Sequence, residues 1–175
     1  AALLPASGPA LALSSDAGQP MEIEADRVDY DEKRGIMVYR GDVVATQGTL
    51  RITADEATAH IDDGALQRVV ATGGPATYRQ RPDGEEQDVT GRGGRMEYSV
   101  VDSRLVLLDD AVLVQRGNTL RSQRIVYDTA RDVARAGGSG SEPGAAPERV
   151  RITLEPRPAD GENGEEADGD DAAAE

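Results

Sequence analysis

Apolar and polar residues alternate one by one along several short stretches of this chain. Residues 21–26, 50–55 and 149–154 follow this pattern. Successive side chains of a β-strand point to opposite faces, so each stretch predicts a strand with one buried and one wet face. No window of a dozen residues carries a convincing helical stripe, and the best candidate, 53–61, has Thr and Ala on both of its faces. The chain is therefore predicted to be all-β.

Turn-forming residues separate the alternating stretches, and the stretches repeat. A shift of 68 residues places Arg27 on Arg95, Tyr30 on Tyr98 and Val38 on Val106. Strand pairs that cannot bury a face alone must stack on one another, which predicts an antiparallel jelly roll or slender sandwich open at its ends. Residues 81–88 read as a tolerated insertion in one repeat. The predicted turns are 31–35, 62–64, 73–75, 82–84 and 116–118, with further Gly- or Asp-marked turns at 41–42 and 109–110.

Composition excludes several kinds of site. The 175 residues contain no Cys and one His, so disulfides, thiol nucleophiles, Cys-bound zinc and multi-His metal centres are ruled out, and we expect no metal or cofactor. A net charge of -14 argues against a nucleic-acid partner bound through its phosphates. Five Tyr, no Phe and no Trp leave the core to aliphatic residues, which favours thin sheet layers with room between them.

Catalytic constellations are also missing from the sequence. His60 is the one His and is expected on the surface at a strand end, and no Gly-x-Ser-x-Gly accompanies it. The acid pairs 62–63 and 109–110 lie in predicted turns, where acids are routine. The Gly-rich run 91–94 has no P-loop Lys after it. We therefore expect a protein that is not an enzyme.

The two ends differ from the body. Residues 1–12 read as the trailing part of a secretory signal peptide that ends at Ala10-Leu11-Ala12, or else as an Ala- and Pro-rich leader. Residues 156–175 hold eight acids and one Arg, which predicts a disordered acidic tail. A flexible loop is expected at 137–147, and the folded domain at 20–155. A secreted chain without Cys suits the periplasm.

Several motifs of the body occur in a recognisable order. Ile23-Glu24-Ala25-Asp26 is followed by residues 39–43 (Tyr-Arg-Gly-Asp-Val), 46–49 (Thr-Gln-Gly-Thr) and 52–55 (Ile-Thr-Ala-Asp), and then by the Gly-rich segments 73–78 and 91–98. Over residues 20–155 this order resembles the OstA-like family of periplasmic lipopolysaccharide-transport proteins.

The resemblance implies a twisted, V-shaped jelly roll of some sixteen short antiparallel strands. It implies that lipopolysaccharide acyl chains bind between the two sheets. It also implies end-to-end stacking, with further copies and with OstA-fold domains of inner- and outer-membrane components, into a bridge that carries lipopolysaccharide outward. The inner-membrane component of such a bridge carries an N-terminal anchor and the outer-membrane component a long barrel; this chain shows neither, which indicates the middle piece.

Other interpretations stay open at this point. The chain fits another OstA-like bridge component. A β-solenoid surface or adhesion protein would also show short alternating strands, but as parallel coils near a 20-residue spacing. A carbohydrate-active solenoid enzyme would need acids clustered on one face.

Alternation also nominates site residues. Each inward residue is either a lipid contact or ordinary core, and the parity of Tyr39 cannot be read because the run 36–39 is continuously apolar. Arg27, Arg95 and Arg124 either meet phosphates at the groove mouth or are solvated. The groove candidates are Met21, Ile23, Val28, Tyr30, Tyr39, Ile52, Tyr78, Met96, Tyr98 and Val100.

The two terminal strands of the domain are candidate stacking edges, because an unpaired strand is a template for another chain. We expect the first strand of one copy to pair with the last strand of the next, acids against arginines. The alternative is that Glu22, Glu24 and Asp26 only protect a blunted edge from aggregation. The residues involved are Glu22, Ile23 and Glu24 on one edge and Arg149, Val150, Arg151 and Ile152 on the other.

Overall fold

The computed structural model describes residues 15–137 and 149–155. The predicted signal-peptide segment 1–12 and the predicted acidic tail 156–175 lie outside the described residues. So does the predicted loop 137–147, apart from Gly137.

The described chain is a β-protein with one short 3-10 helix and ten strands. Six of the strands are long, at 11 to 16 residues each. In chain order the elements are η1 (Ser15–Gly18), β1 (Glu22–Glu24), β2 (Arg27–Asp31), β3 (Ile36–Gln47), β4 (Leu50–Asp62), β5 (Ala65–Gln80), β6 (Val89–Ser99), β7 (Arg104–Gln115), β8 (Asn118–Asp128), β9 (Val133–Ala136) and β10 (Arg151–Thr153).

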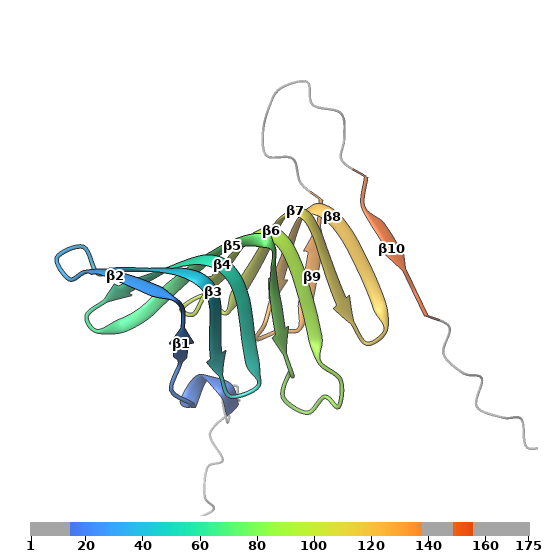
Figure 1. The fold of residues 1–175 in the computed structure, drawn as a ribbon. Helices are drawn as coiled ribbons and strands as arrows, with labels where there is room; N and C mark the ends of the chain where they lie inside the picture. The colour runs from blue at the N-terminus through green and yellow to red at the C-terminus, as the bar shows by residue number, and fades with distance from the viewer. Residues whose placement is uncertain (1–14, 138–148, 156–175) are drawn as a thin grey trace, which may run out of the picture.

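All ten strands belong to one sheet in which every neighbouring pair is antiparallel. The order is β1-β3-β4-β5-β6-β7-β8-β10, with β2 also on β3 and β9 also on β8. The predicted all-β, antiparallel fold is confirmed. The solenoid alternatives are wrong, because their coils would pair in parallel. Figure 1 shows the long strands crossing a common ridge and descending on both sides of it.

The ridge is made by β-bulges, which bend a strand where an extra residue interrupts the pairing. Register shifts occur at Arg40/Val43 in β3, Thr53/Glu56 in β4, Thr72/Ala76 in β5, Arg92/Arg95 in β6 and Leu108/Ala111 in β7. Each long strand therefore continues through the bend, and the expected sixteen short strands are ten strands in the described chain.

The bend divides the sheet into two layers that face each other, as in a V. Tyr78 and Tyr98 come from opposite layers, and their ring centroids are 6.5 Å apart. Layer A consists of β1, β10 and residues 43–47, 50–54, 76–80, 89–93, 111–115 and 118–122. Layer B consists of β2, β9 and residues 36–40, 56–62, 65–72, 95–99, 104–108 and 124–128.

Three of the predicted turns are wrong, and all three lie at the bend. Residues 41–42, 73–75 and 109–110 fall inside β3, β5 and β7 rather than between strands. Gly41 and Asp42 have φ of 80° and 42°, and Asp109 and Asp110 have φ of 61° and 55°. Gly and Asp, which are typical of chain reversals, here adopt the left-handed backbone conformation of a bulge. The other predicted turns and the 81–88 loop lie between strands, as expected.

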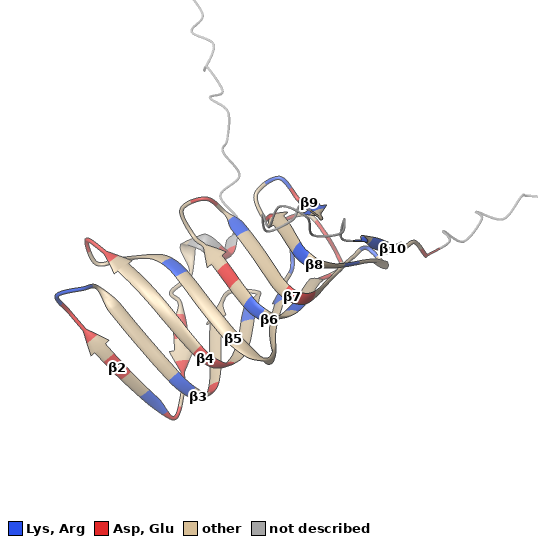
Figure 2. Cartoon of the chain, turned by 90° about the horizontal axis from the view of Figure 1, so that it is seen from above, with Lys and Arg blue, Asp and Glu red and all other residues tan. Residues whose placement is uncertain are grey.

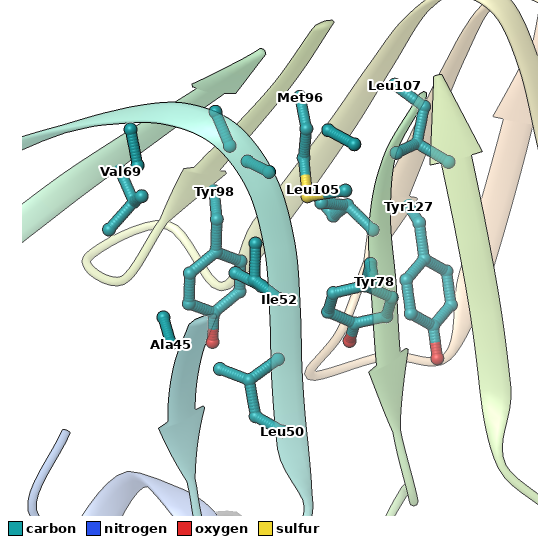
Figure 3. Close-up of a cluster of buried hydrophobic side chains, with 14 of the residues drawn as sticks. Ala45, Leu50, Ile52, Val69, Tyr78, Met96, Tyr98, Leu105, Leu107 and Tyr127 are labelled. Atoms are coloured by element: carbon teal, nitrogen blue, oxygen red, sulfur yellow. The ribbon is translucent and has the colours of Figure 1, made fainter. Parts of the chain in front are cut away.

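Inward side chains form continuous rows from one end of the sheet to the other. In layer A, successive cross-strand neighbours on the inner face are Ile23, Ala45, Ile52, Tyr78, Gly91, Leu113, Leu120 and Ile152. In layer B, one row is Val28, Tyr39, Ala57, Ala71, Met96, Leu107, Ile125 and Ala136. Figure 3 shows side chains of both layers meeting in the core.

The helix η1 caps the rim of layer A, on the side away from the ridge. The Asp16 carboxylate is 4% exposed and accepts hydrogen bonds from the Thr49 amide (2.7 Å), the Thr49 hydroxyl (2.6 Å) and Gln80 Nε2 (2.8 Å). Burial by itself raises the pKa of Asp16, but these bonds outweigh burial and leave the pKa below its ordinary value. The ionised carboxylate therefore stabilises the fold.

The bend offers a test of backbone strain at Asp109. We expect Asp109→Val to be less stable than Asp109→Gly by roughly 1–2 kcal/mol, because a β-branched residue resists φ near 61° and glycine does not. Urea unfolding measures the difference. Both variants lose the same carboxylate, so equal stabilities would contradict a left-handed bulge at this position.

Asp16 makes stability depend on pH. Its folded-state pKa is lowered, so its contribution is complete above the unfolded-state pKa and is lost as the pH falls through the folded-state value. We expect Asp16→Asn to cost about 1–3 kcal/mol at pH 7 and to flatten the acid limb of the stability curve. Thermal unfolding from pH 7 to pH 3 measures this. Asp63→Asn, in an exposed turn, is the control; parallel curves for Asp16→Asn and the parent chain would contradict the assignment.

Candidate functional site

The predicted groove residues fall into three environments. Ile52, Tyr78, Met96 and Tyr98 belong to the buried core cluster. Met21, Ile23, Tyr39 and Val100 are partly buried and pack against that cluster. Val28 and Tyr30 are each 54% exposed. All ten side chains lie on the inner faces or on the segments beside them, and their contact with lipid stays a prediction.

The middle of the V is packed rather than hollow. Tyr78 and Met96 are each 1% exposed, and a Cβ added to Gly91 in layer A would lie 2.8 Å from Leu107 Cδ1 in layer B. The expectation of an aliphatic core with room between the layers is wrong, because Tyr78, Tyr98 and Tyr127 belong to the core and the layers approach closely. Burial raises the pKa of Tyr78 and Tyr98, so their hydroxyls stay protonated, and Tyr78 donates to Gln80 Oε1 at 2.5 Å.

The interior opens toward the C-terminal end of the sheet. A cavity of about 190 Å³ lies there between the layers. Leu113, Leu120 and Ile152 line it from layer A, and Ala134 of β9 lines it from layer B. These residues continue the inner rows that start at β1 and β2, so the cavity is the C-terminal end of one apolar path.

The exposed apolar surface is concentrated at the two ends of the sheet. Of the seven exposed large hydrophobic residues among those described, all but Val101 lie in or beside an end strand. Monomeric proteins rarely leave such residues clustered unless they form a contact. The six are Val28 and Tyr30 in β2, Val133 in β9, and Val150, Ile152 and Leu154 in and beside β10.

Each end presents two strand edges, one from each layer. Among residues 15–137 and 149–155, β1 and β2 pair only with β3, and β9 and β10 pair only with β8. On β1, Glu22 and Glu24 point away from the core while Ile23 packs on it. On and beside β10, Arg149, Val150, Arg151 and Ile152 are exposed. The sheet is therefore open at both predicted stacking edges, and whether another chain pairs there is a prediction.

A polar cluster joins the two layers at the edge opposite the ridge, near the C-terminal end of the sheet. The alternation pattern gave no signal for it. Asp132, in the β8–β9 turn of layer B, accepts hydrogen bonds from Tyr127, Gln115 and Arg116, of which the last two lie at the far edge of layer A. Arg116 also binds Glu85 at 2.6 Å. Burial and the adjacent Asp132 carboxylate raise the pKa of Tyr127 strongly, which keeps its hydroxyl a donor.

The three arginines considered for the groove mouth are elsewhere. Arg27, Arg95 and Arg124 belong to one outward row of layer B beside the bend, and Arg95 binds Glu97 at 2.8 Å. Their position beside the bend, away from the open edge of the layers, favours solvated side chains over phosphate contacts, and their role stays a prediction. Figure 2 shows acidic and basic residues interspersed on this side of the sheet.

Residues considered for chemistry stand apart from one another. His60 lies near the end of β4, half-buried, and burial together with the charge of Arg68 lowers its pKa. Within 15–137 and 149–155, no group of His, Asp and Glu is arranged to hold a metal ion. The same residues contain no helix long and apolar enough to cross a membrane.

Comparison with known proteins gives the family. Residues 22–133 match the family described as LptA/(LptD N-terminal domain) LPS transport protein. The lipopolysaccharide export system protein LptH of Pseudomonas aeruginosa is 39% identical over 153 residues, covering 86% of this chain and 87% of that protein. The lipopolysaccharide export system protein LptA of Escherichia coli K12 is 33% identical over 127 residues, covering 71% and 68%.

A solved structure shows the same fold. The crystal structure of Pseudomonas aeruginosa LptH, titled the LptA homologous periplasmic component of the conserved lipopolysaccharide transport device, superposes with a TM-score of 0.75. It is 37% identical and covers 81% of this chain and 99% of its own. The resemblance found in the motifs is thus confirmed, and the chain belongs to the LptA/(LptD N-terminal domain) family of lipopolysaccharide transport proteins.

Proposed function

We propose that this protein is a periplasmic carrier of lipopolysaccharide that shelters acyl chains between its two layers. Copies of it would stack end to end into a bridge from the inner to the outer membrane. The observation that carries the proposal is an apolar inner face that runs unbroken from β1 to β10 and meets open strand edges at both ends. Its partners would be lipopolysaccharide, further copies of itself and OstA-fold domains of the membrane components. No catalytic step is proposed.

The energetics favour an apolar path over a polar one. Burying acyl carbon stabilises by about 0.8 kcal/mol per methylene, so a chain of about twelve carbons is worth on the order of 10 kcal/mol. A lipid with several such chains needs continuous apolar surface along the whole route. The inner rows supply it, and the cavity beside Leu113 and Leu120 supplies a free entry to it.

Strand directions support stacking by simple continuation of the sheet. Neighbours alternate in direction along the eight strands from β1 to β10, so the two end strands run in opposite directions. β10 of one copy placed beside β1 of the next therefore makes an antiparallel pair. The same holds in layer B for β9 beside β2.

Continuing the inner rows also fixes a register for the junction. If Ile152 lies opposite Ile23, then Arg151 faces Glu24 and Arg149 faces Asp26 on the outer side, as antiparallel pairing requires. In layer B, Ala136 opposite Val28 places Arg135 against Asp29. Both seams thus join apolar to apolar on the inside and Arg to acid on the outside, and the exposed Val28 and Tyr30 become covered.

Charge reversal tests this register. We expect Arg151→Glu and Glu24→Arg each to weaken self-association about tenfold or more, because each creates a like-charge pair at the seam. The double variant, which restores opposite charges at every junction, should recover it. Sedimentation velocity at low salt measures the distribution of oligomers. Arg68→Glu, in the middle strand β5, is the control. A double variant no better than the singles would refute the register.

Site-specific photo-crosslinking tests the acyl path. A photoreactive residue at Ile23, Tyr78 or Val100 is expected to capture lipopolysaccharide, because these side chains lie on or against the inner core. The outward neighbours Glu24 and Arg51 are the matched controls. Capture is read on gels with labelled lipopolysaccharide. Equal capture by both sets would remove the inner path as the binding site.

A further inference from the structure

The outer face of layer A carries a band of arginines. Thr77, Arg92, Val112, Arg121 and Arg151 are successive cross-strand neighbours on β5, β6, β7, β8 and β10, on the face opposite the core. The next outward row adds Arg79 on β5. The inner-path proposal uses none of Arg79, Arg92 or Arg121.

These charges are poorly compensated within the described chain. No ion pair joins Arg92, Arg121 or Arg151 to an acid among residues 15–137 and 149–155, whereas Arg79 is held by Asp88. Two acids, Asp109 and Asp110, line this face at the ridge, and the Asp110 carboxylate accepts a hydrogen bond from Gln123 at 3.0 Å. In a chain of net charge -14, a face with unpaired guanidinium groups attracts an anionic partner.

The face is hollowed where the arginines lie. A cavity of about 410 Å³ is lined mostly by outward residues of β5 to β8. Arg92 and Arg121 lie on either side of Val112, which is 9% exposed. A second cavity of about 580 Å³ shares Val112 and Arg121 and continues to Arg149 and Arg151. We call the two together the basic trough. Guanidinium groups bind carboxylates with paired hydrogen bonds, so the trough suits an acidic peptide.

The chain itself supplies such a peptide next to the trough. Residues 156–175 follow β10 directly and contain eight acids and one Arg. Three strand spacings separate β10 from Arg92 on β6, roughly 15 Å, and twenty residues can span far more than that. A tethered segment is also present at a high effective concentration, on the order of millimolar.

We propose that the acidic C-terminal segment 156–175 docks in the basic trough, with its carboxylates on Arg92 and Arg121. Exposed ion pairs are individually weak, so the docked state depends on several pairs together and weakens with salt. Asp110 at the ridge repels carboxylates, which directs the segment toward the part of the trough away from the bend. The inference does not depend on lipid binding, and Arg92 and Arg121 lie on β6 and β8, away from the residues that the stacking register uses.

Arginine side-chain NMR tests the docking on the full chain and on a chain that ends at Glu155. At about 20 mM NaCl the Nε–Hε signals of Arg92 and Arg121 are expected to differ between the two chains, and the difference should collapse at about 500 mM NaCl. Arg68 and Arg104 on the outer face of layer B are the controls. Identical spectra at low salt, or equal shifts at the controls, would overturn the proposal.

A synthetic peptide of residues 156–175 separates docking from other effects of truncation. Added to the shortened chain, it should restore the full-chain signals, and a peptide with its eight acids replaced by amides should not. The pair Arg92→Gln and Arg121→Gln should lower peptide affinity at least tenfold, and Arg68→Gln with Arg104→Gln should leave it unchanged. If inorganic phosphate shifts Arg92 and Arg121 but the peptide does not, the trough is an anion site of another kind and the proposal fails.

Discussion

The bend in the long strands is the constraint on which the rest of this molecule depends. A flat sheet of ten strands would leave both faces in water. Bulges at the same level of five consecutive strands bend the sheet, so that the two halves of one face pack against each other. The hydrogen-bonded ladders stay within each layer, and the apolar face becomes an interior. In the part of the chain that the structure describes, no further strand covers either end, so the interior is open there along the sheet axis.

Open ends expose an isolated protein to aggregation, because unpaired strand edges can pair with the strands of other chains. Here the edges are short, at three to five residues, and carry charges on their outer side. The charges differ in sign between the ends: acids dominate β1 and β2, and arginines flank and begin β10. In the proposed stacking, a like end would be repelled and an unlike end attracted, so the charges that protect the edges from indiscriminate pairing would also select one orientation of contact.

Period-two alternation was enough to predict strands, antiparallel pairing and the open ends, because each of these follows from local side-chain direction. The bend was not predictable in this way. Gly73-Gly74-Pro75 has the composition of a chain reversal, and only its pairing partners show that β5 runs through it. The 68-residue repeat held the missing information: the bulge at Arg40/Val43 recurs at Leu108/Ala111, and Asp109-Asp110 adopts the left-handed backbone of Gly41-Asp42. Likewise alternation placed Val28 and Tyr30 on the inner face, but their exposure follows from β2 being an edge.

The packed middle of the V bears directly on how such a protein could hold lipid. An acyl chain that enters between the layers replaces one apolar neighbour by another, so the contacts that Met96 and Leu107 lose across the gap are regained against methylenes. The polar contacts across the open edge have no such replacement; they join Asp132 of layer B to Gln115 and Arg116 of layer A. These are few, whereas each acyl chain of about twelve carbons contributes on the order of 10 kcal/mol. Parting of the layers about the bend is therefore within reach of the lipid's own hydrophobic energy, and a closely packed interior is compatible with a path that opens as acyl chains enter.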